Sequence, residues 1–230
     1  MMQKSHFWPI FARCGRLGYH RLMRLNRTAI IFLTILCLLL AACSGTPPAA
    51  EKKAEPVKPP QPVTGLSAFY RMYGVARGWA PDAQVLQLRS LPLQEVKSEA
   101  GKAGAWEATF VSLSRGRSRV YTFSVVEAGG NLHKDVFAGP EESYAGASGQ
   151  NQPFPASAVK IDSEKAYGVA LQHGADYAKK NPNMPVMFLL EWTRRHRFPA
   201  WRVIWGESVS ISGFSVFVDG GDGSYLETAR

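Results

Sequence analysis

Residues 199–218 read PAWRVIWGESVSISGFSVFV and contain the clearest structural pattern in the chain. Large apolar side chains occupy every second position on either side of the short segment GESVSIS. They are Trp201, Val203 and Trp205 before it, and Phe214, Val216 and Val218 after it. A period of two is typical of β-strands with one buried face. The stretch therefore predicts two neighbouring strands.

The residues before this stretch predict a helix and one more strand. Ile161-Asp162 supplies a hydrophobic staple and an N-cap, and apolar residues recur at helical spacing until Asn181-Pro182-Asn183 ends the helix. The helical face is formed by Ala166, Val169, Ala170 and Tyr177, and the alternating strand positions are Val186, Phe188, Leu190 and Trp192. The order predicted for this part of the chain is α-β-β-β.

The same order is predicted upstream. Thr64 can cap a helix that continues to Trp79-Ala80-Pro81 and buries Leu66, Phe69, Tyr70, Tyr73 and Ala76. Strands are expected over Gln84–Arg89, Trp106–Leu113 and Arg119–Glu127. A helix laid across a three-stranded antiparallel sheet buries one face of that sheet.

Three sequence matches suggest that the two parts are copies of one unit. Tyr-Gly-Val-Ala occurs at 73–76 and 167–170, Phe-Ser-Val at 123–125 and 214–216, and a tryptophan follows the first motif at 106 and 201. Matches in the same order are typical of a tandem repeat. The predicted fold class is α+β, with two tandem α-β-β-β units at 64–139 and 158–230, each a helix packed on a small antiparallel sheet. A Gly/Pro/Ser-rich connector, 140–157, joins them.

The end of the second unit resembles a PepSY domain. Pro199-Ala200-Trp201-Arg202-Val203 is followed by Phe217-Val218-Asp219, by a glycine-rich turn, and by Tyr225-Leu226-Glu227. The turn at 220–223 departs from the Ala-x-Thr-Gly that is usual in the family. The resemblance covers 158–230 and reaches 64–139 through the repeat. PepSY domains occur in propeptides of secreted metallopeptidases and in envelope proteins, so the resemblance implies peptidase inhibition or regulation.

The first 42 residues predict an export signal. Arg24 and Arg27 precede the apolar run 29–42, which is too short to cross a bilayer comfortably. Leu40-Ala41-Ala42-Cys43 resembles a bacterial lipobox, which implies cleavage before Cys43 and its acylation, with palmitate as a typical acyl chain. The alternative is an ordinary signal peptide with an incidental cysteine. Met23 is a second candidate for the initiator.

Residues 43–63 are predicted to form a lipidated Pro-rich linker. Six prolines among small and charged residues are typical of a semi-rigid tether. By resemblance to Gram-negative sorting signals, Ser44 favours the outer membrane, facing the periplasm. The bilayer, reached through acylated Cys43, is thus one expected partner.

Charge and cysteine content change when the leader is removed. The chain has 27 cations and 18 acids, and the first 42 residues hold six of the cations and no acid, which leaves 21 against 18. A net charge of +3 gives little support to nucleic-acid binding. Cys43 is then the one remaining cysteine, so no internal disulfide is expected.

Catalytic and metal motifs are missing from the sequence. His133, His173 and His196 have no metal-ligand spacing, and neither a Gly-x-Ser-x-Gly motif nor a phosphate-binding glycine loop occurs. Asp219 and Asp222 supply too few oxygens for Ca²⁺, and a hairpin turn explains the glycines around them. We therefore expect no enzyme activity, metal or cofactor.

A basic segment between two predicted strands is the candidate partner-binding site. Its residues are Arg194, Arg195, Arg197 and Phe198. One interpretation is a solvated hairpin, because charged turns are routine. The other is a tip that docks an acidic partner, lipid headgroups or another envelope polymer.

These observations predict a membrane-anchored, non-catalytic envelope lipoprotein. Its expected role is to bind a protein or peptide, and the PepSY resemblance implies that it regulates or inhibits a secreted peptidase. An alternative is a structural or assembly lipoprotein that binds an envelope component. A third is an enzyme whose catalytic residues are dispersed along the chain.

Overall fold

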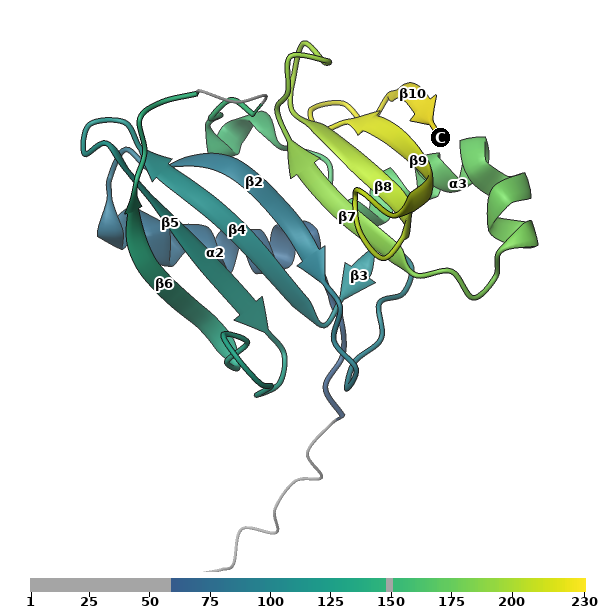
Figure 1. Ribbon diagram of the computed structural model, residues 1–230, viewed down its shortest axis with the longest axis horizontal. Helices are drawn as coiled ribbons and strands as arrows, with labels where there is room; N and C mark the ends of the chain where they lie inside the picture. The colour runs from purple at the N-terminus through teal and green to yellow at the C-terminus, as the bar shows by residue number, and fades with distance from the viewer. Residues whose placement is uncertain (1–58, 148–150) are drawn as a thin grey trace, which may run out of the picture. The chain divides into compact units, whose positions relative to one another are not determined.

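The computed structural model describes residues 59–147 and 151–230, which fold as an α+β structure with one large antiparallel sheet (Figure 1). The first helix and the strands up to residue 143 are β1 (Val63–Thr64), α2 (Gly65–Trp79), β2 (Gln84–Leu91), β3 (Lys102–Ala103), β4 (Ala105–Ser112), β5 (Arg117–Ser124) and β6 (Asp135–Ser143). After the 3-10 turn η2 (Ala156–Ala158) come α3 (Ser163–Lys180), β7 (Val186–Glu191), β8 (Ala200–Gly206), β9 (Ser212–Asp219) and β10 (Tyr225–Ala229).

The strands of both halves belong to the same sheet. Its order is β10-β9-β8-β7-β2-β4-β5-β6, every neighbouring pair is antiparallel, and β1 pairs separately with β3. The expectation of two small sheets is therefore wrong, because β2 and β7 join them into eight strands. The described residues, 59–147 and 151–230, accordingly belong to one compact unit.

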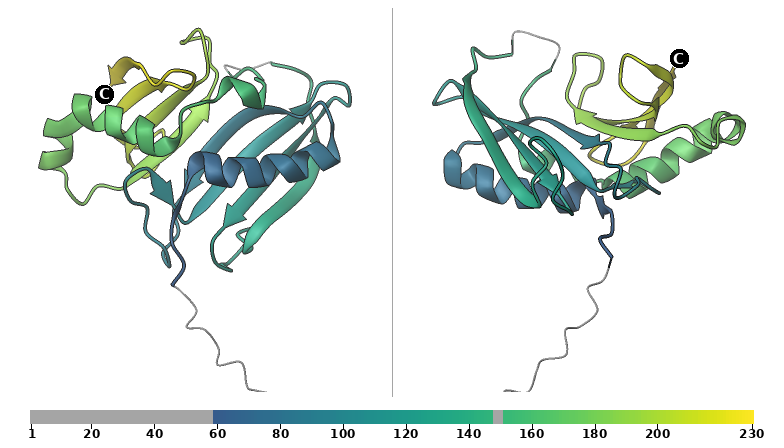
Figure 2. Two further views of the ribbon diagram at one scale, coloured as in Figure 1. Left: turned by 180° about the vertical axis from the view of Figure 1, so that it is seen from behind. Right: turned by 60° about the horizontal axis from the view of Figure 1, so that its bottom comes forward.

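Both helices cover one face of this sheet (Figure 2). The predicted N-caps are confirmed: the Thr64 side chain accepts from Ser67 N–H, and the Asp162 carboxylate accepts from Ser163 N–H. The helix α2 packs mainly on β4 and β5, and α3 packs on β8 and β9. The strands expected around Trp106, Trp201 and Phe214 are β4, β8 and β9.

Trp106 and Trp201 are the centre of the core. Both are fully buried, and their rings meet edge-on with centroids 6.4 Å apart. The indole N–H of Trp106 donates to Val63 C=O at 3.1 Å, and that of Trp201 donates to Ile161 C=O at 2.8 Å. Each carbonyl belongs to the residue before a helix N-cap. The same strand-to-helix hydrogen bond therefore occurs in both halves.

The other two sequence matches are out of register. Tyr73 is the ninth residue of α2, whereas Tyr167 is the fifth residue of α3, so the motifs differ by about one helical turn. Phe123 lies opposite Trp106 in the sheet, but Val218, not Phe214, lies opposite Trp201. The tryptophans occupy matching positions, and the shorter motifs do not.

Two edge strands were not expected from the sequence. β6 and β10 close the sheet at its two ends, and β6 runs from the first predicted unit across the boundary at 139 into the predicted connector. Pro140 lies within β6, which is compatible with an edge strand because one side of such a strand carries no ladder. Each half thus contributes four strands to the sheet.

Candidate functional site

The hydrogen-bonded ladder between β2 and β7 is short. It covers three residue pairs and ends at Arg89 and Leu189. The next N–H along β7, that of Phe188, donates to the side chain of Ser90 at 3.0 Å. Beyond this point β2 follows β4 to its last residue, while β7 follows β8. The two central strands therefore separate within the sheet.

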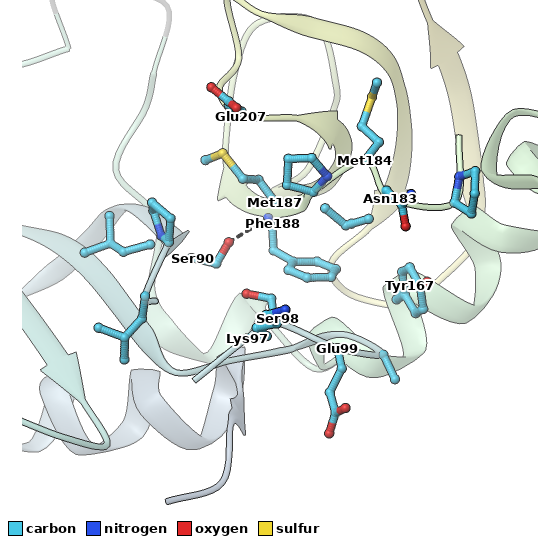
Figure 3. A pocket seen from close by; sticks show the side chains of 17 residues that line it. Ser90, Lys97, Ser98, Glu99, Tyr167, Asn183, Met184, Met187, Phe188 and Glu207 are labelled. Carbon is cyan, nitrogen blue, oxygen red and sulfur yellow. Dashed lines mark hydrogen bonds between the residues drawn. The ribbon is translucent and has the colours of Figure 1, made fainter. Parts of the chain in front are cut away.

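A cleft of about 840 Å³ lies where the strands separate (Figure 3). Its apolar lining is contributed by Leu91, Leu93, Met184, Val186, Met187 and Phe188. Tyr167 of α3 closes one side, and the segment 97–100 closes another. The exposed side chains of Lys97, Glu99 and Glu207 stand at the rim. A volume of this size lies in the range of binding sites, and the lining mixes these apolar side chains with polar ones such as Ser90, Ser98 and Asn183.

Prolines lie at the ends of β2 and β7 that border the cleft. Pro92 follows the last residue of β2, and Pro182 and Pro185 precede the first residue of β7. Proline has no N–H and cannot extend a ladder that needs one. The ladder already ends at Arg89 and Leu189, before these prolines, so they do not start the separation. Pro92, which has no N–H, keeps β2 from pairing further along the cleft.

The backbone of Val186 faces the cleft. Gly206 N–H donates to Pro185 C=O at 2.9 Å, and Val186 lies opposite Trp205 in the β7–β8 ladder. Because backbone groups alternate along a strand, the N–H and C=O of Val186 point away from β8 and toward β2. Among residues 59–147 and 151–230, no strand pairs with Val186 on that side.

The predicted basic segment forms the β7–β8 connection, at the opposite end of β7 from the cleft. Arg194, Arg197 and Phe198 are exposed, and the guanidinium of Arg197 lies over the Phe198 ring, 5.6 Å from its centroid. Phe198 keeps 55% of its surface exposed. These three residues are available to a partner, but they do not line the cleft.

Arg195 differs from its neighbours because it is tied to the last strand. Its guanidinium pairs with the Glu227 carboxylate of β10, with an Nη2–Oε2 distance of 2.8 Å, and lies over the Phe217 ring. The hydrogen bond from Arg195 lowers the pKa of Glu227. The adjacent His196 is largely buried, which lowers its pKa. Arg195 and His196 thus connect the β7–β8 segment to β10, and the Arg195 side chain stays 51% exposed.

Other ionisable groups are held by local contacts. Glu191 accepts from the Asn151 amide at 2.9 Å, and burial raises its pKa. Asp219 accepts from Gly221 N–H at 2.7 Å in the β9–β10 turn, which confirms the predicted hairpin. Within 59–147 and 151–230, no group of three or more His, Cys, Asp or Glu side chains could hold a metal ion.

The cleft was missed by sequence reasoning. Its walls come from segments about 90 residues apart, 90–100 and 182–188, so only the β2–β7 pairing brings them together. The sequence did contain one indication: proline follows the last residue of β2 and precedes the first residue of β7, and these two strand ends lie together in the fold.

The predicted export signal, 1–42, and Cys43 lie outside the described residues, as does most of the linker. In the part of the chain that the structure covers, neither helix has the length and apolar character needed to cross a membrane.

Comparisons with known proteins show no family for this chain. No family model and no curated protein matches the chain, so PepSY membership stays a prediction from residues 199–227. Among solved structures, the crystal structure of a "putative lipoprotein" from Clostridium difficile 630 is similar at 12% identity and a TM-score of 0.46. The match covers 74% of this chain and 93% of that chain.

Proposed function

We propose that this chain is a lipid-anchored, non-catalytic binding protein of the bacterial envelope that holds a partner polypeptide in the cleft between β2 and β7. The observation that carries the proposal is the early end of the β2–β7 ladder, which opens a cleft of about 840 Å³ with apolar and polar walls inside the sheet. Burying that lining against a partner would remove apolar surface from water.

The anchor part of the proposal comes from the sequence. Acylated Cys43 would hold the protein on a membrane, with Ser44 directing it to the outer membrane on the periplasmic side. Replacing Cys43 by Ser should release the protein from the membrane fraction and remove the mass of the acyl chains. An unchanged membrane fraction for Cys43→Ser would contradict the anchor.

The specific version of the proposal is regulation or inhibition of a secreted peptidase by two PepSY-like units. The matching indole hydrogen bonds of Trp106 and Trp201 support descent of the two halves from one unit. The family association supports the peptidase as partner. Assay of the captured partner for peptidase activity, with and without this protein, tests that version.

In-cell photocrosslinking tests the cleft. A photoreactive phenylalanine analogue replaces Met187 in the cleft, and the matched control carries it at Leu113, which is 54% exposed in the β4–β5 turn. We expect a discrete crosslinked polypeptide from position 187 and none from position 113. The Met187→Arg variant should no longer capture the same polypeptide, even when the photoreactive residue is placed at a third position outside the cleft and the basic segment. Crosslinking from 113 alone would overturn the cleft as the binding site.

A second candidate is an assembly lipoprotein that docks an envelope component through the β7–β8 connection. The exposed Phe198 with Arg197 over its ring favours it. An Arg194→Glu/Arg197→Glu double variant should then lose its partner while Met187→Arg keeps it. The opposite result favours the cleft.

A further inference from the structure

We propose that the cleft takes its partner as an extended peptide segment that pairs with the backbone of Val186 as an added strand and places a basic side chain at Glu207. This inference rests on the proposed function, because it names the kind of ligand that the same cleft accepts. It follows from the backbone groups and the charges that the cleft presents.

The backbone groups in the cleft suit a strand. Val186 presents one N–H and one C=O on the side where no strand of residues 59–147 and 151–230 pairs with it. On the opposite wall, backbone groups alternate along β2, so Ser90 C=O points into the cleft. That carbonyl is not used by Phe188, whose N–H donates to the Ser90 side chain. Pro92 removes the next donor on that wall. An added strand therefore has its best partner in β7.

A peptide is favoured over a small apolar ligand or an acyl chain. Either of the latter would cover the Val186 N–H without giving it an acceptor, and an unpaired buried donor costs about 1–3 kcal/mol. A peptide carbonyl supplies that acceptor, and its side chains reach the apolar walls at Leu91, Met187 and Phe188 on alternate faces.

The rim charges favour a basic ligand residue. Glu99 and Glu207 are exposed, and neither forms an ion pair among residues 59–147 and 151–230. Lys97 is the single cation in the lining. Glu207, which directly follows β8, lines the same cleft as Met187 (Figure 3). With acidic side chains and backbone carbonyls prevailing, a Lys or Arg on the peptide is the complementary group.

The test uses phage-displayed random dodecapeptides selected on the full chain in detergent micelles. Selected peptides are synthesised, and their affinity is measured by fluorescence anisotropy for the wild type, Val186→Pro and Val186→Ala. Proline deletes the N–H that faces the cleft, whereas alanine shortens the side chain and keeps the N–H. We expect Val186→Pro to bind about tenfold more weakly than Val186→Ala.

A second measurement covers the case in which Val186→Pro perturbs the fold. In the wild type, hydrogen exchange of the Val186 amide should slow when the selected peptide binds. Glu207→Lys should weaken binding and enrich for peptides with acidic residues, whereas Glu142→Lys on the far edge strand β6 should change neither property.

The outcomes separate this inference from the proposed function. Strand addition would be overturned, and the cleft kept as the site, by peptides with three properties. They shift the NMR signal of the Met187 methyl group, they bind Val186→Pro and Val186→Ala equally, and they leave the Val186 amide unprotected from exchange. Peptides whose binding leaves Met187 and Val186 unaffected would overturn both. If the selected peptides bind Glu207→Lys as tightly as the wild type, the proposed placement of a basic peptide side chain at Glu207 is wrong.

Discussion

Ser163 Oγ accepts a hydrogen bond from Gly65 N–H at 2.7 Å, which ties the first residue of α3 to the first residue of α2. The same hydroxyl donates to Gly101 C=O at 2.6 Å. Beside it, Asp162 Oδ1 accepts from Leu66 N–H at 2.9 Å as well as from the N–H of its own helix. One carboxylate thus accepts a hydrogen bond from one unpaired N–H group in the first turn of each helix, where negative charge is stabilising.

Replacing Ser163 by Ala should destabilise the fold. The side chain is buried, so its loss leaves the Gly65 N–H and the Gly101 C=O without a partner, at about 1–3 kcal/mol for each unsatisfied group. Urea unfolding measures the free energy of unfolding. The matched control, Ser67→Ala on the exposed side of α2, should stay within about 0.5 kcal/mol of the wild type. Equal effects of the two variants would contradict the prediction.

Two glycines of α2 should respond oppositely to alanine. A Cβ on Gly65 would lie 2.7 Å from the Trp201 ring and 3.1 Å from the Trp106 ring, and we expect a loss of about 1–3 kcal/mol in the free energy of unfolding. A Cβ on Gly74 meets nothing within 4 Å, so Gly74→Ala should gain about 0.5–1 kcal/mol through helix propensity. Thermal unfolding distinguishes the two, and a destabilised Gly74→Ala would be inconsistent with this packing.

Asp82 should contribute to acid sensitivity. The Ser112 hydroxyl donates to its carboxylate at 2.7 Å and the Ser114 N–H at 3.0 Å, and these bonds lower its pKa from 3.8 to about 2. A depressed native pKa stabilises the fold above the unfolded-state value, and this stabilisation is lost as the pH falls from about 4 to about 2. Asp82→Asn should therefore melt below the wild type at pH 7, with the difference shrinking over that window. A difference that is constant from pH 7 to pH 2 would refute the assignment.

The Arg195–Glu227 pair should hold the last strand in place. Because both side chains are partly exposed, Arg195→Ala should cost roughly 1 kcal/mol or less in global stability. The larger effect is local: amide exchange in β10 should speed up, and the difference from the wild type should shrink in high salt. Arg194→Ala, one residue away and without an ion pair among the described residues, serves as the control. Similar exchange in both variants would contradict the role of Arg195.

Local chemistry explains which parts of the fold were predictable. Thr64 and Asp162 indicate where the helices begin, because each side chain caps the N-terminus of the helix that follows it. The strand around Trp201 was predictable because a buried face imposes a period of two. Strand β10 has only a weak alternation, since none of its five residues is fully buried.

Long-range pairing explains what was not predictable. Nothing in the local sequence of β2 says that its free edge meets β7, and the cleft depends on that contact. The basic segment was located correctly between two strands, but the Arg195–Glu227 pair brings in a residue 32 positions away. Whether Arg194, Arg195, Arg197 and Phe198 bind a partner stays a prediction.

The three-pair junction between β2 and β7 also protects two surfaces that neither half could cover alone. Were the two halves separated, β2 would become a bare edge beside Leu88, and β7 a bare edge beside Phe188 and Leu190. Long apolar edges recruit strands from other copies of a chain. By pairing β2 with β7, the junction therefore keeps both edges from pairing with other copies of the chain, and each half covers an edge of the other that would favour aggregation.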